Sequence, residues 1–269
     1  MVLSPDLSGK VALVTGAGRG VGRTIAETLA AHGARVALVA RSADQLAEAE
    51  RAIAATGGSA RAFPADLTRP AEVLTRLQAD VARTLGPPAI LVNCAGIYGP
   101  IAPIARSDPA LWLRTIQVNT FGPYLTCRAF VGEMIAAGWG RIVNLTSAAA
   151  LHPPGPLTSA YATSKIALNS LTRSLAAELA GSGVTANMIH PGDLKTEMWR
   201  DVRDGALALG PEGAFLRDWA AWVEQTGGDP PEKAADLVLR LLRDDAASIN
   251  GQFLWIEGGL QAAGETPWS

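Results

Sequence analysis

Short runs rich in Val, Ile and Leu recur along the chain, and stretches of helical period separate them. The strongest runs lack the polar and apolar alternation of a half-exposed strand, so they predict strands that are buried on both faces. They cover residues 10–16, 34–41, 89–96, 141–147, 184–192 and 251–259, and a weaker run at 60–66 predicts one further strand. Strands that alternate with helices favour an α/β fold with a doubly wound parallel sheet.

The stretches between these runs carry signals for the start and end of helices. Ser42 stands in capping-box register with Gln45, and Gly33 is a predicted C-terminal cap. Asp108 and Asp229 are predicted N-caps, because a proline follows each of them at the first helical position. We find no internal repeat and no linker, so we expect one domain over residues 1–269.

Composition narrows the class of partner. The net charge of −2 and the pI of about 6.0 provide no basic field for nucleic acid. Cys94 and Cys127 are the only cysteines and lack the spacing of metal ligands. The first residues lack the basic start of a signal peptide, and no window approaches the apolar length of a membrane span. We therefore expect no metal, no nucleic acid or membrane partner, and a cytoplasmic location.

A glycine-rich turn, TGAGRGVG, follows the first predicted strand and opens a helix. Free backbone N–H groups and the helix dipole make such a turn an anion site. Gly16, Gly20 and Gly22 have the spacing GxxxGxG, with Val21 where GxGxxG would have its last glycine. The turn predicts a pyrophosphate site, and an ordinary tight turn is the alternative.

Arg41 and Ser42 end the second predicted strand, where NAD-binding folds usually carry a carboxylate for the ribose 2′-OH. An arginine there suits a 2′-phosphate, and Arg19 of the glycine turn is placed to approach the same phosphate. The pattern predicts NADP(H). If Arg41 is only solvated, NAD(H) is the alternative cofactor.

Several motifs follow in the order of the short-chain dehydrogenase/reductase family, which the chain resembles over nearly its full length. They are TGAGRGVG at 15–22, DL at 66–67, NCAG at 93–96, Asn119, Ser147 of NLTS, YATSK at 161–165 and PGDLKT at 191–196. The resemblance, which extends to 3-oxoacyl-ACP reductases and other NADP(H)-dependent carbonyl reductases, implies a Rossmann-type, seven-stranded parallel sheet flanked by helices on both faces. It also implies a homotetramer formed through the terminal strand that starts near Gly251.

Tyr161 and Lys165 are four residues apart, so on a helix they share one face. The ordinary tyrosine pKa near 10 is too high for proton exchange at neutral pH, and we expect the Lys165 ammonium to lower it. Tyr161 would then be the general acid in reduction and the general base in oxidation. Ser147 would donate a hydrogen bond to the same substrate oxygen, with Thr146 as the alternative, and Asn119 would position a water beside Lys165.

By the same resemblance, a second group of residues surrounds the cofactor. Asp66 and Leu67 would flank adenine, Asn93, Ala95 and Gly96 would line the cleft, Tyr161 and Lys165 would reach the nicotinamide ribose, and Pro191, Gly192 and Thr196 would flank the nicotinamide. For Asp66, a plain helix N-cap is the alternative. Cys94 is expected to be a small buried side chain.

Residues 194–228 follow the sixth strand, beyond the sheet edge where ligands bind in such folds. The resemblance implies that they form a mobile substrate lid. The substrate candidates are Tyr98, His152, Met198 and Trp199, with Trp112, Phe215, Trp219 and Trp222 as further aromatic side chains. Packing of a helix hairpin onto the body or onto a neighbouring subunit is the alternative for the aromatic residues, and a plain surface position is the alternative for His152.

Together these features predict an NADP(H)-dependent oxidoreductase that transfers hydride between nicotinamide and a ketone, aldehyde or secondary alcohol. An NAD-dependent alcohol or polyol dehydrogenase that acts oxidatively is the alternative. A catalytically idle dinucleotide-binding regulator is disfavoured, because Tyr161 and Lys165 are both present.

Overall fold

A parallel sheet of seven strands lies at the centre of the computed structural model, which describes residues 5–151 and 155–256. The spatial order is β3-β2-β1-β4-β5-β6-β7, and every neighbouring pair is parallel. The strands are β1 (Val11–Thr15), β2 (Arg35–Ala40), β3 (Ser59–Pro64), β4 (Ile90–Asn93), β5 (Gly140–Leu145), β6 (Val184–His190) and β7 (Phe253–Trp255). The predicted fold class is confirmed, including the strand expected from the weaker run.

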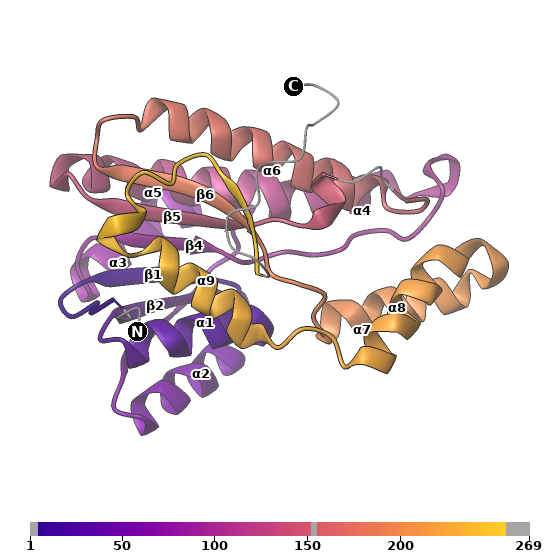
Figure 1. The fold of residues 1–269 in the computed structure, drawn as a ribbon, viewed down its shortest axis with the longest axis horizontal. Coiled ribbons are helices and arrows are strands. Elements are labelled where there is room, and N and C mark those ends of the chain that lie inside the picture. Colours follow the sequence, from indigo (N-terminus) through magenta and orange to yellow (C-terminus); the bar gives the residue numbers. More distant parts are fainter. Residues whose placement is uncertain (1–4, 152–154, 257–269) are drawn as a thin grey trace.

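Helices cover both faces of this sheet (Figure 1). On one face lie α1 (Gly20–Ala31), α2 (Ala43–Ala55) and α9 (Pro231–Leu241), and on the other α3 (Gln78–Thr84), α5 (Gly122–Ala137) and α6 (Ser159–Glu178). The helix α4 (Pro109–Ile116) packs beside α6. A π-helical turn, Gln117–Phe121, joins α4 to α5.

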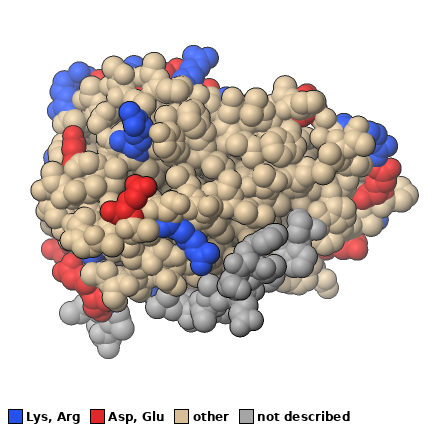
Figure 2. Space-filling model, turned by 90° about the horizontal axis from the view of Figure 1, so that it is seen from above, with Lys and Arg blue, Asp and Glu red and all other residues tan. Residues whose placement is uncertain are grey.

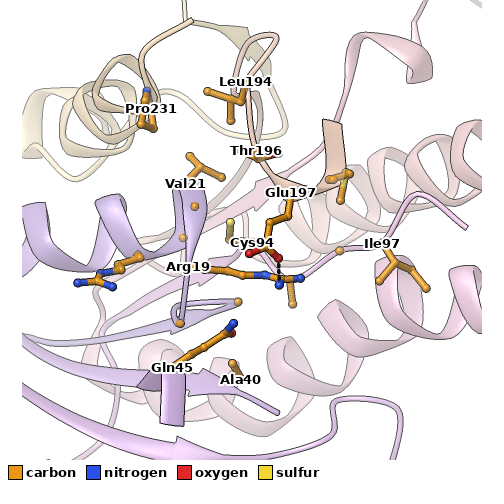
Figure 3. A pocket seen from close by; sticks show the side chains of 18 of the residues that line it. Arg19, Val21, Ala40, Gln45, Cys94, Ile97, Leu194, Thr196, Glu197 and Pro231 are labelled. Atoms are coloured by element: carbon orange, nitrogen blue, oxygen red, sulfur yellow. Dashed lines mark ion pairs between the residues drawn. The ribbon is translucent and has the colours of Figure 1, made fainter. Parts of the chain in front are cut away.

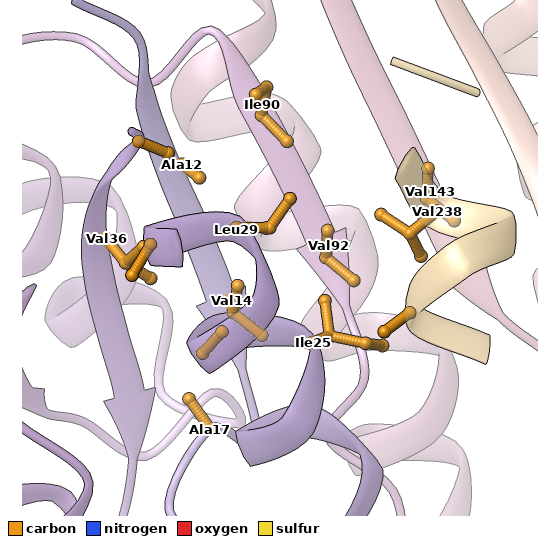
Figure 4. Packing of buried hydrophobic residues seen from close by; sticks show 14 of the residues in the cluster. Ala12, Val14, Ala17, Ile25, Leu29, Val36, Ile90, Val92, Val143 and Val238 are labelled. Carbon is orange, nitrogen blue, oxygen red and sulfur yellow. The ribbon is translucent and has the colours of Figure 1, made fainter. Parts of the chain in front are cut away.

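Consecutive residues of β1 point into opposite layers, which explains the uninterrupted apolar runs in the sequence. Val14 packs with Ile25 of α1 in one buried cluster (Figure 4). Leu13 packs in the other cluster, which also contains Phe130 of α5. Each fully buried side chain of this size stabilises the fold by about 1.5–3 kcal/mol relative to exposure, so the buried positions of β1 favour apolar residues.

Two predicted N-caps are confirmed. The Ser42 hydroxyl accepts a hydrogen bond from the Gln45 N–H at 3.4 Å, and the Asp108 carboxylate accepts one from the Ala110 N–H at 2.8 Å. The predicted stop at Gly33 is also confirmed, because α1 ends at Ala31 and Gly33 adopts a positive φ of 93°. Local capping chemistry therefore set these three helix boundaries.

The third predicted N-cap, Asp229, is wrong by one residue. The helix α9 begins at Pro231, with Pro230 as its cap. The Asp229 carboxylate instead accepts a hydrogen bond from the Asp193 N–H at 3.0 Å and pairs with Lys233 at 3.1 Å. A tertiary partner has replaced the local one.

The predicted lid, residues 194–228, forms a hairpin of two helices that projects beyond the edge of the sheet (Figure 1). These helices are α7 (Glu197–Ala208) and α8 (Ala214–Thr226), joined by a short turn at Gly210–Gly213. The ends of the hairpin are held together at its base, because the Asp229 N–H also donates to the Asp193 carbonyl at 2.9 Å.

Within residues 5–151 and 155–256, the helices are too short or too polar to cross a bilayer. The same part of the chain brings together no group of three or more His, Cys, Asp and Glu side chains of the kind that holds a metal ion.

Candidate active site

A cavity of about 1180 Å³ opens at the carboxyl end of the sheet, where the strand order reverses between β1 and β4 (Figure 3). The glycine turn, the end of β2, the segments after β3 and β4 and the start of the lid all border it. The predicted site residues that line the cavity are Gly16, Arg19, Gly20, Val21, Gly22, Arg41, Ser42, Asp66, Leu67, Ala95, Gly96, Thr196 and Met198. Tertiary structure thus brings most of the predicted cofactor residues together.

The glycine turn has the shape that a phosphate group needs. A Cβ on Gly22 would lie 2.5 Å from the Gly16 carbonyl oxygen, and one on Gly16 would lie 2.9 Å from the Ala95 Cα. Arg19, the residue before α1, gives this helix no side-chain cap, so it leaves the first N–H groups of the helix to another partner. A diphosphate fits this turn, because it would accept those hydrogen bonds and meet the positive end of the helix dipole.

Three side chains were predicted to lie near the ribose of the cofactor, and each has different neighbours. Arg41 is exposed at the end of β2, and the Ser42 hydroxyl is engaged in capping α2. Arg19 forms an ion pair with Glu197 at the start of α7, as the dashed line in Figure 3 marks. The sequence carries no local signal for this pairing, because 178 positions separate the partners.

Asp66 is held as a carboxylate by neighbours from two segments. It accepts hydrogen bonds from the Thr68 N–H at 3.0 Å and the Thr68 hydroxyl at 2.8 Å, and Arg114 Nη2 lies 3.2 Å away. Burial alone would raise the pKa of Asp66, but these donors lower it to about 2. The N-cap alternative is wrong, because the next helical segment starts only at Pro70, four residues after Asp66.

Tyr161 and Lys165 both lie on α6, as predicted, and the Lys165 Nζ is 5.7 Å from the centroid of the Tyr161 ring. The ammonium donates a hydrogen bond to the Leu145 carbonyl at 2.9 Å. Burial lowers the pKa of Lys165 to about 8. The shared helix face is confirmed.

The expected lowering of the pKa of Tyr161 is wrong for this arrangement. Burial raises the pKa of Tyr161, a hydrogen bond with Ser147 lowers it, and the negative charge of Asp193 raises it further. Desolvation is the largest of these three influences, and the Lys165 ammonium donates its hydrogen bond to the Leu145 carbonyl and not to the phenol. The phenol is therefore protonated at neutral pH.

Ser147 and its competitor Thr146 point in different directions. The Thr146 hydroxyl is buried and donates to Asn169 Oδ1 at 2.7 Å. Ser147 is half-buried, accepts from the Ala149 N–H at 3.2 Å and lies close enough to Tyr161 to lower the pKa of the phenol. Of the two, Ser147 is the hydroxyl beside the phenol.

Asn119 lies in the π-helical turn between α4 and α5 and is fully buried. Its amide accepts from the Ile97 N–H at 2.9 Å and donates to the Ile97 carbonyl at 2.8 Å and to the Ser164 hydroxyl at 2.9 Å. A Cβ on Gly96 would lie 3.4 Å from Asn119 Oδ1 and 3.7 Å from Lys165 Nζ. Asn119 therefore fixes the cavity wall next to Lys165.

Asn93 does not face the cofactor cavity, which corrects its predicted role. It is 2% exposed, donates to Asn144 Oδ1 at 2.8 Å and accepts from the Thr126 hydroxyl at 2.7 Å. These bonds connect β4, β5 and α5. The predicted cleft contact after β4 falls instead to Ala95 and Gly96.

Thr15 at the end of β1 is a positioning residue that sequence reasoning missed. Its hydroxyl accepts from the N–H groups of Cys94 and Ala95, at 3.0 and 3.1 Å, and so holds the segment after β4 in place. Cys94 itself is half-buried and lines the cavity, and desolvation raises the pKa of its thiol to about 12.

The substrate candidates divide into three groups. Tyr98 stacks on Tyr161, and Met198 lines the cavity. Trp199 is 3% exposed and donates to the Ala220 carbonyl at 3.2 Å, so it packs inside the lid and its prediction as a substrate contact is corrected. His152 lies outside the described residues, as do positions 257–259 of the predicted terminal strand.

The segment between β6 and α7 connects the site to the lid. Pro191 and Gly192 lie outside the cavity lining, and Gly192 has a φ of 92° that a non-glycine residue rarely adopts. Thr196 caps α7 by accepting from the Trp199 N–H at 3.5 Å. Between them, Asp193 accepts a hydrogen bond from Trp219 Nε1 at 3.0 Å.

Comparison with known proteins agrees with this geometry. The family model for short chain dehydrogenases matches residues 10–206. Galactitol 2-dehydrogenase (L-tagatose-forming) from Cereibacter sphaeroides is 38% identical over 258 residues, which cover 94% of this chain and 95% of that protein.

Two solved structures extend the similarity to three dimensions. NAD⁺-bound xylitol dehydrogenase has a TM-score of 0.84 at 30% identity, over 95% of this chain and 100% of that one. A gluconate 5-dehydrogenase from Burkholderia cenocepacia J2315, in complex with NADP and tartrate, has a TM-score of 0.81 at 30% identity, over 94% of this chain and 96% of that one. Sequence and structure thus agree that the protein belongs to the short-chain dehydrogenase/reductase family of oxidoreductases.

Proposed function

We propose that this protein is an NADP(H)-dependent carbonyl reductase and alcohol dehydrogenase. The observation that carries the proposal is the meeting of Tyr161, Ser147 and Lys165 beside a cavity that the glycine turn lines. The nicotinamide, when bound, supplies or accepts the hydride. Residues 1–269 would form one catalytic domain, with residues 194–228 as the substrate lid.

The cofactor would lie along the cavity, with its adenine end near Asp66 and its nicotinamide end near Lys165. The glycine turn would bind its diphosphate, and Asp66 and Leu67 would flank the adenine. Arg41 would pair with the 2′-phosphate, and its exposed guanidinium supports this role. Lys165 would hold the nicotinamide ribose, with Thr196 beside the nicotinamide.

The proton would come from Tyr161. A buried phenol with a raised pKa remains protonated at neutral pH, which suits a general acid that donates to a carbonyl oxygen as hydride arrives. Ser147 would donate a hydrogen bond to the same oxygen, where negative charge develops. Asn119 would position a water that links Lys165 to solvent, as predicted from the sequence.

The second candidate is an NAD-dependent dehydrogenase that oxidises polyols. Galactitol 2-dehydrogenase and NAD⁺-bound xylitol dehydrogenase are among the similar proteins. In addition, Glu197 forms an ion pair with Arg19, which is one of the two arginines predicted to bind the 2′-phosphate. NAD has no 2′-phosphate and would leave this ion pair undisturbed. An idle regulator is disfavoured, because the acid/base side chains meet in one place.

Binding of NADPH and NADH to the purified protein, followed by fluorescence titration, tests the cofactor. The Arg41→Ala variant should weaken NADPH binding about tenfold or more and NADH binding hardly at all. The reason is that only NADPH carries the 2′-phosphate with which Arg41 would form a charge-assisted hydrogen bond. A preference for NADH that survives this substitution would move the polyol dehydrogenase to first place.

A panel of ketones, aldehydes, secondary alcohols and polyols tests the reaction on the same sample. The Tyr161→Phe variant should lose about 10²-fold or more of its turnover while it still binds cofactor, because only the proton donor is removed. Undiminished turnover in this variant would contradict the mechanism.

We also propose that the protein is a homotetramer and works in the cytoplasm. The face that carries α6 shows few charged side chains over its centre (Figure 2). Large apolar side chains are exposed on or next to α4, α5 and α6, at Leu113, Phe121, Tyr124, Ile135 and Ile166. Light scattering on the purified protein would test the assembly, and a monomer at micromolar concentration would contradict it.

A further inference from the structure

Two consecutive residues of the glycine turn meet two consecutive residues at the start of α7. Arg19 forms its ion pair with Glu197 (Figure 3), and a Cβ on Gly20 would lie 3.7 Å from Thr196 Cγ2. All four residues line the cavity. The base of the lid therefore rests directly on the turn that is proposed to bind the diphosphate.

Arg19 stands between the lid and the proposed 2′-phosphate position. On its other side in the sequence, Gly18 lies against Gln45, because a Cβ on Gly18 would be 3.0 Å from the Gln45 Cβ. Gln45 belongs to the first turn of α2, directly after Arg41 and Ser42. The Arg19 side chain thus has the lid carboxylate on one side and the ribose end of the cavity on the other.

We infer that Glu197 shifts the preference of the protein from NADPH toward NADH by competing with the 2′-phosphate for Arg19. Arg19 Nη1 faces the Glu197 carboxylate, and a guanidinium that is directed at one anion cannot at the same time make paired hydrogen bonds with a second anion on its other side. A cofactor with a 2′-phosphate would therefore draw Arg19 off the lid, whereas a cofactor with a 2′-OH would leave the ion pair intact. This inference rests on the proposed binding of a dinucleotide in the cavity.

The surroundings of the pair favour such an exchange. The side chains of Arg19 and Glu197 are 57% and 43% exposed, so water screens their attraction and the pair is weak. Arg200 Nη2 lies 3.8 Å from the second oxygen of Glu197. The carboxylate would therefore keep a cationic neighbour after Arg19 has turned away.

The Glu197→Gln variant tests the inference by direct binding of NADPH and NADH, measured as fluorescence dissociation constants. It should bind NADPH about two- to fivefold more tightly than the parent, as expected from the loss of a weak competing ion pair, with NADH binding unchanged. In an Arg19→Met background the same substitution should leave the ratio of the two constants unchanged, because the contested group is gone.

Glu212→Gln is the matched control, because Glu212 also belongs to residues 194–228 and forms an exposed ion pair with Arg106, and neither residue lines the cavity. Its dissociation constants should equal those of the parent. An unchanged ratio of NADPH to NADH affinity in Glu197→Gln would overturn the inference while leaving the proposed function intact. A parent that prefers NADH, with a ratio that still shifts toward NADPH in the variant, would overturn the proposed cofactor and support the inference. Binding of neither nucleotide by the parent would overturn both.

Discussion

Tyr98 lies stacked on Tyr161, with ring centroids 4.6 Å apart and ring planes inclined by 16°. Tyr98 follows the glycine and alanine segment after β4, and Tyr161 lies on α6. Tyr98 also packs, with Trp219 of the lid, against a small apolar cluster that contains Leu157 and Leu216. The phenol that is proposed to move the proton is therefore oriented by a ring that also touches the lid cluster.

Replacement of Tyr98 by Ala should lower kcat/KM about two- to tenfold. A stacked aromatic pair contributes about 0.5–1.5 kcal/mol beyond its buried area, and its loss frees the Tyr161 ring to leave the reactive orientation. Tyr98→Phe keeps the ring and is the control, for which we expect a value near that of the parent. Equal losses in the two variants would show that the hydroxyl of Tyr98, and not the stack, is what the reaction needs.

Asp193 couples the lid to the chemistry through its charge. Its carboxylate accepts from Trp219 Nε1 at 3.0 Å, and its negative charge raises the pKa of Tyr161. Asp193→Asn should therefore lower the pKa of Tyr161, so the rise of the alcohol oxidation rate with pH should move to lower pH. Asp201→Asn, at an exposed position of α7, is the control and should leave the pH profile in place. A profile that stays unchanged in both variants would contradict the coupling.

Lys165 should make the stability of the protein depend on alkaline pH. Burial lowers its pKa from 10.5 to about 8. Below about pH 8, Lys165 is charged in both the folded and the unfolded state, and the full cost of burying the charge lowers the free energy of unfolding. This cost decreases as the pH rises from 8 to 10.5, because the folded state loses the proton first.

Lys165→Met lacks the titrating group. Its free energy of unfolding, measured relative to the parent in urea, should fall by up to about 3 kcal/mol as the pH is raised from 7 to 10.5. A difference that stays constant over this range would mean that Lys165 does not change its protonation on folding.

The charged form of Asp66, unlike that of Lys165, should stabilise the folded state, and this contribution should be lost at acid pH. Although burial works against the charge, the donors around it lower the pKa of Asp66 from 3.8 to about 2, so the carboxylate stabilises the folded state above pH 3.8. This contribution, about 2 kcal/mol by the same relation, is lost as the pH falls through about 2. Asp66→Asn should therefore be less stable than the parent at pH 7 and nearly equal to it near pH 2.

Asp236→Asn, at an exposed position of α9, is the control for this measurement and should show no such pH dependence. Urea unfolding at a series of pH values gives the comparison for both variants. An Asp66→Asn deficit that persists unchanged at pH 2 would show that packing, and not ionisation, causes it.

Much of the fold was decided by the sequence itself, because the interactions that specify it are local. Apolar runs without alternation predicted the strands, and Ser42, Asp108 and Gly33 set helix boundaries through neighbours a few residues away. The glycine turn and the spacing of Tyr161 and Lys165 also follow from neighbouring positions, so the phosphate cradle and the shared helix face were predictable.

Only the tertiary structure decided what those side chains meet. Asp229 accepts a hydrogen bond from the Asp193 backbone and does not cap α9. Trp199 packs inside the lid, and Arg19 forms an ion pair with Glu197. The pKa of Tyr161 is raised by burial and by the charge of Asp193, which is distant in the sequence. Neither influence can be read from a local pattern of residues. Capping and periodicity act over a few residues, whereas desolvation and ion pairing depend on which segments the finished fold brings together.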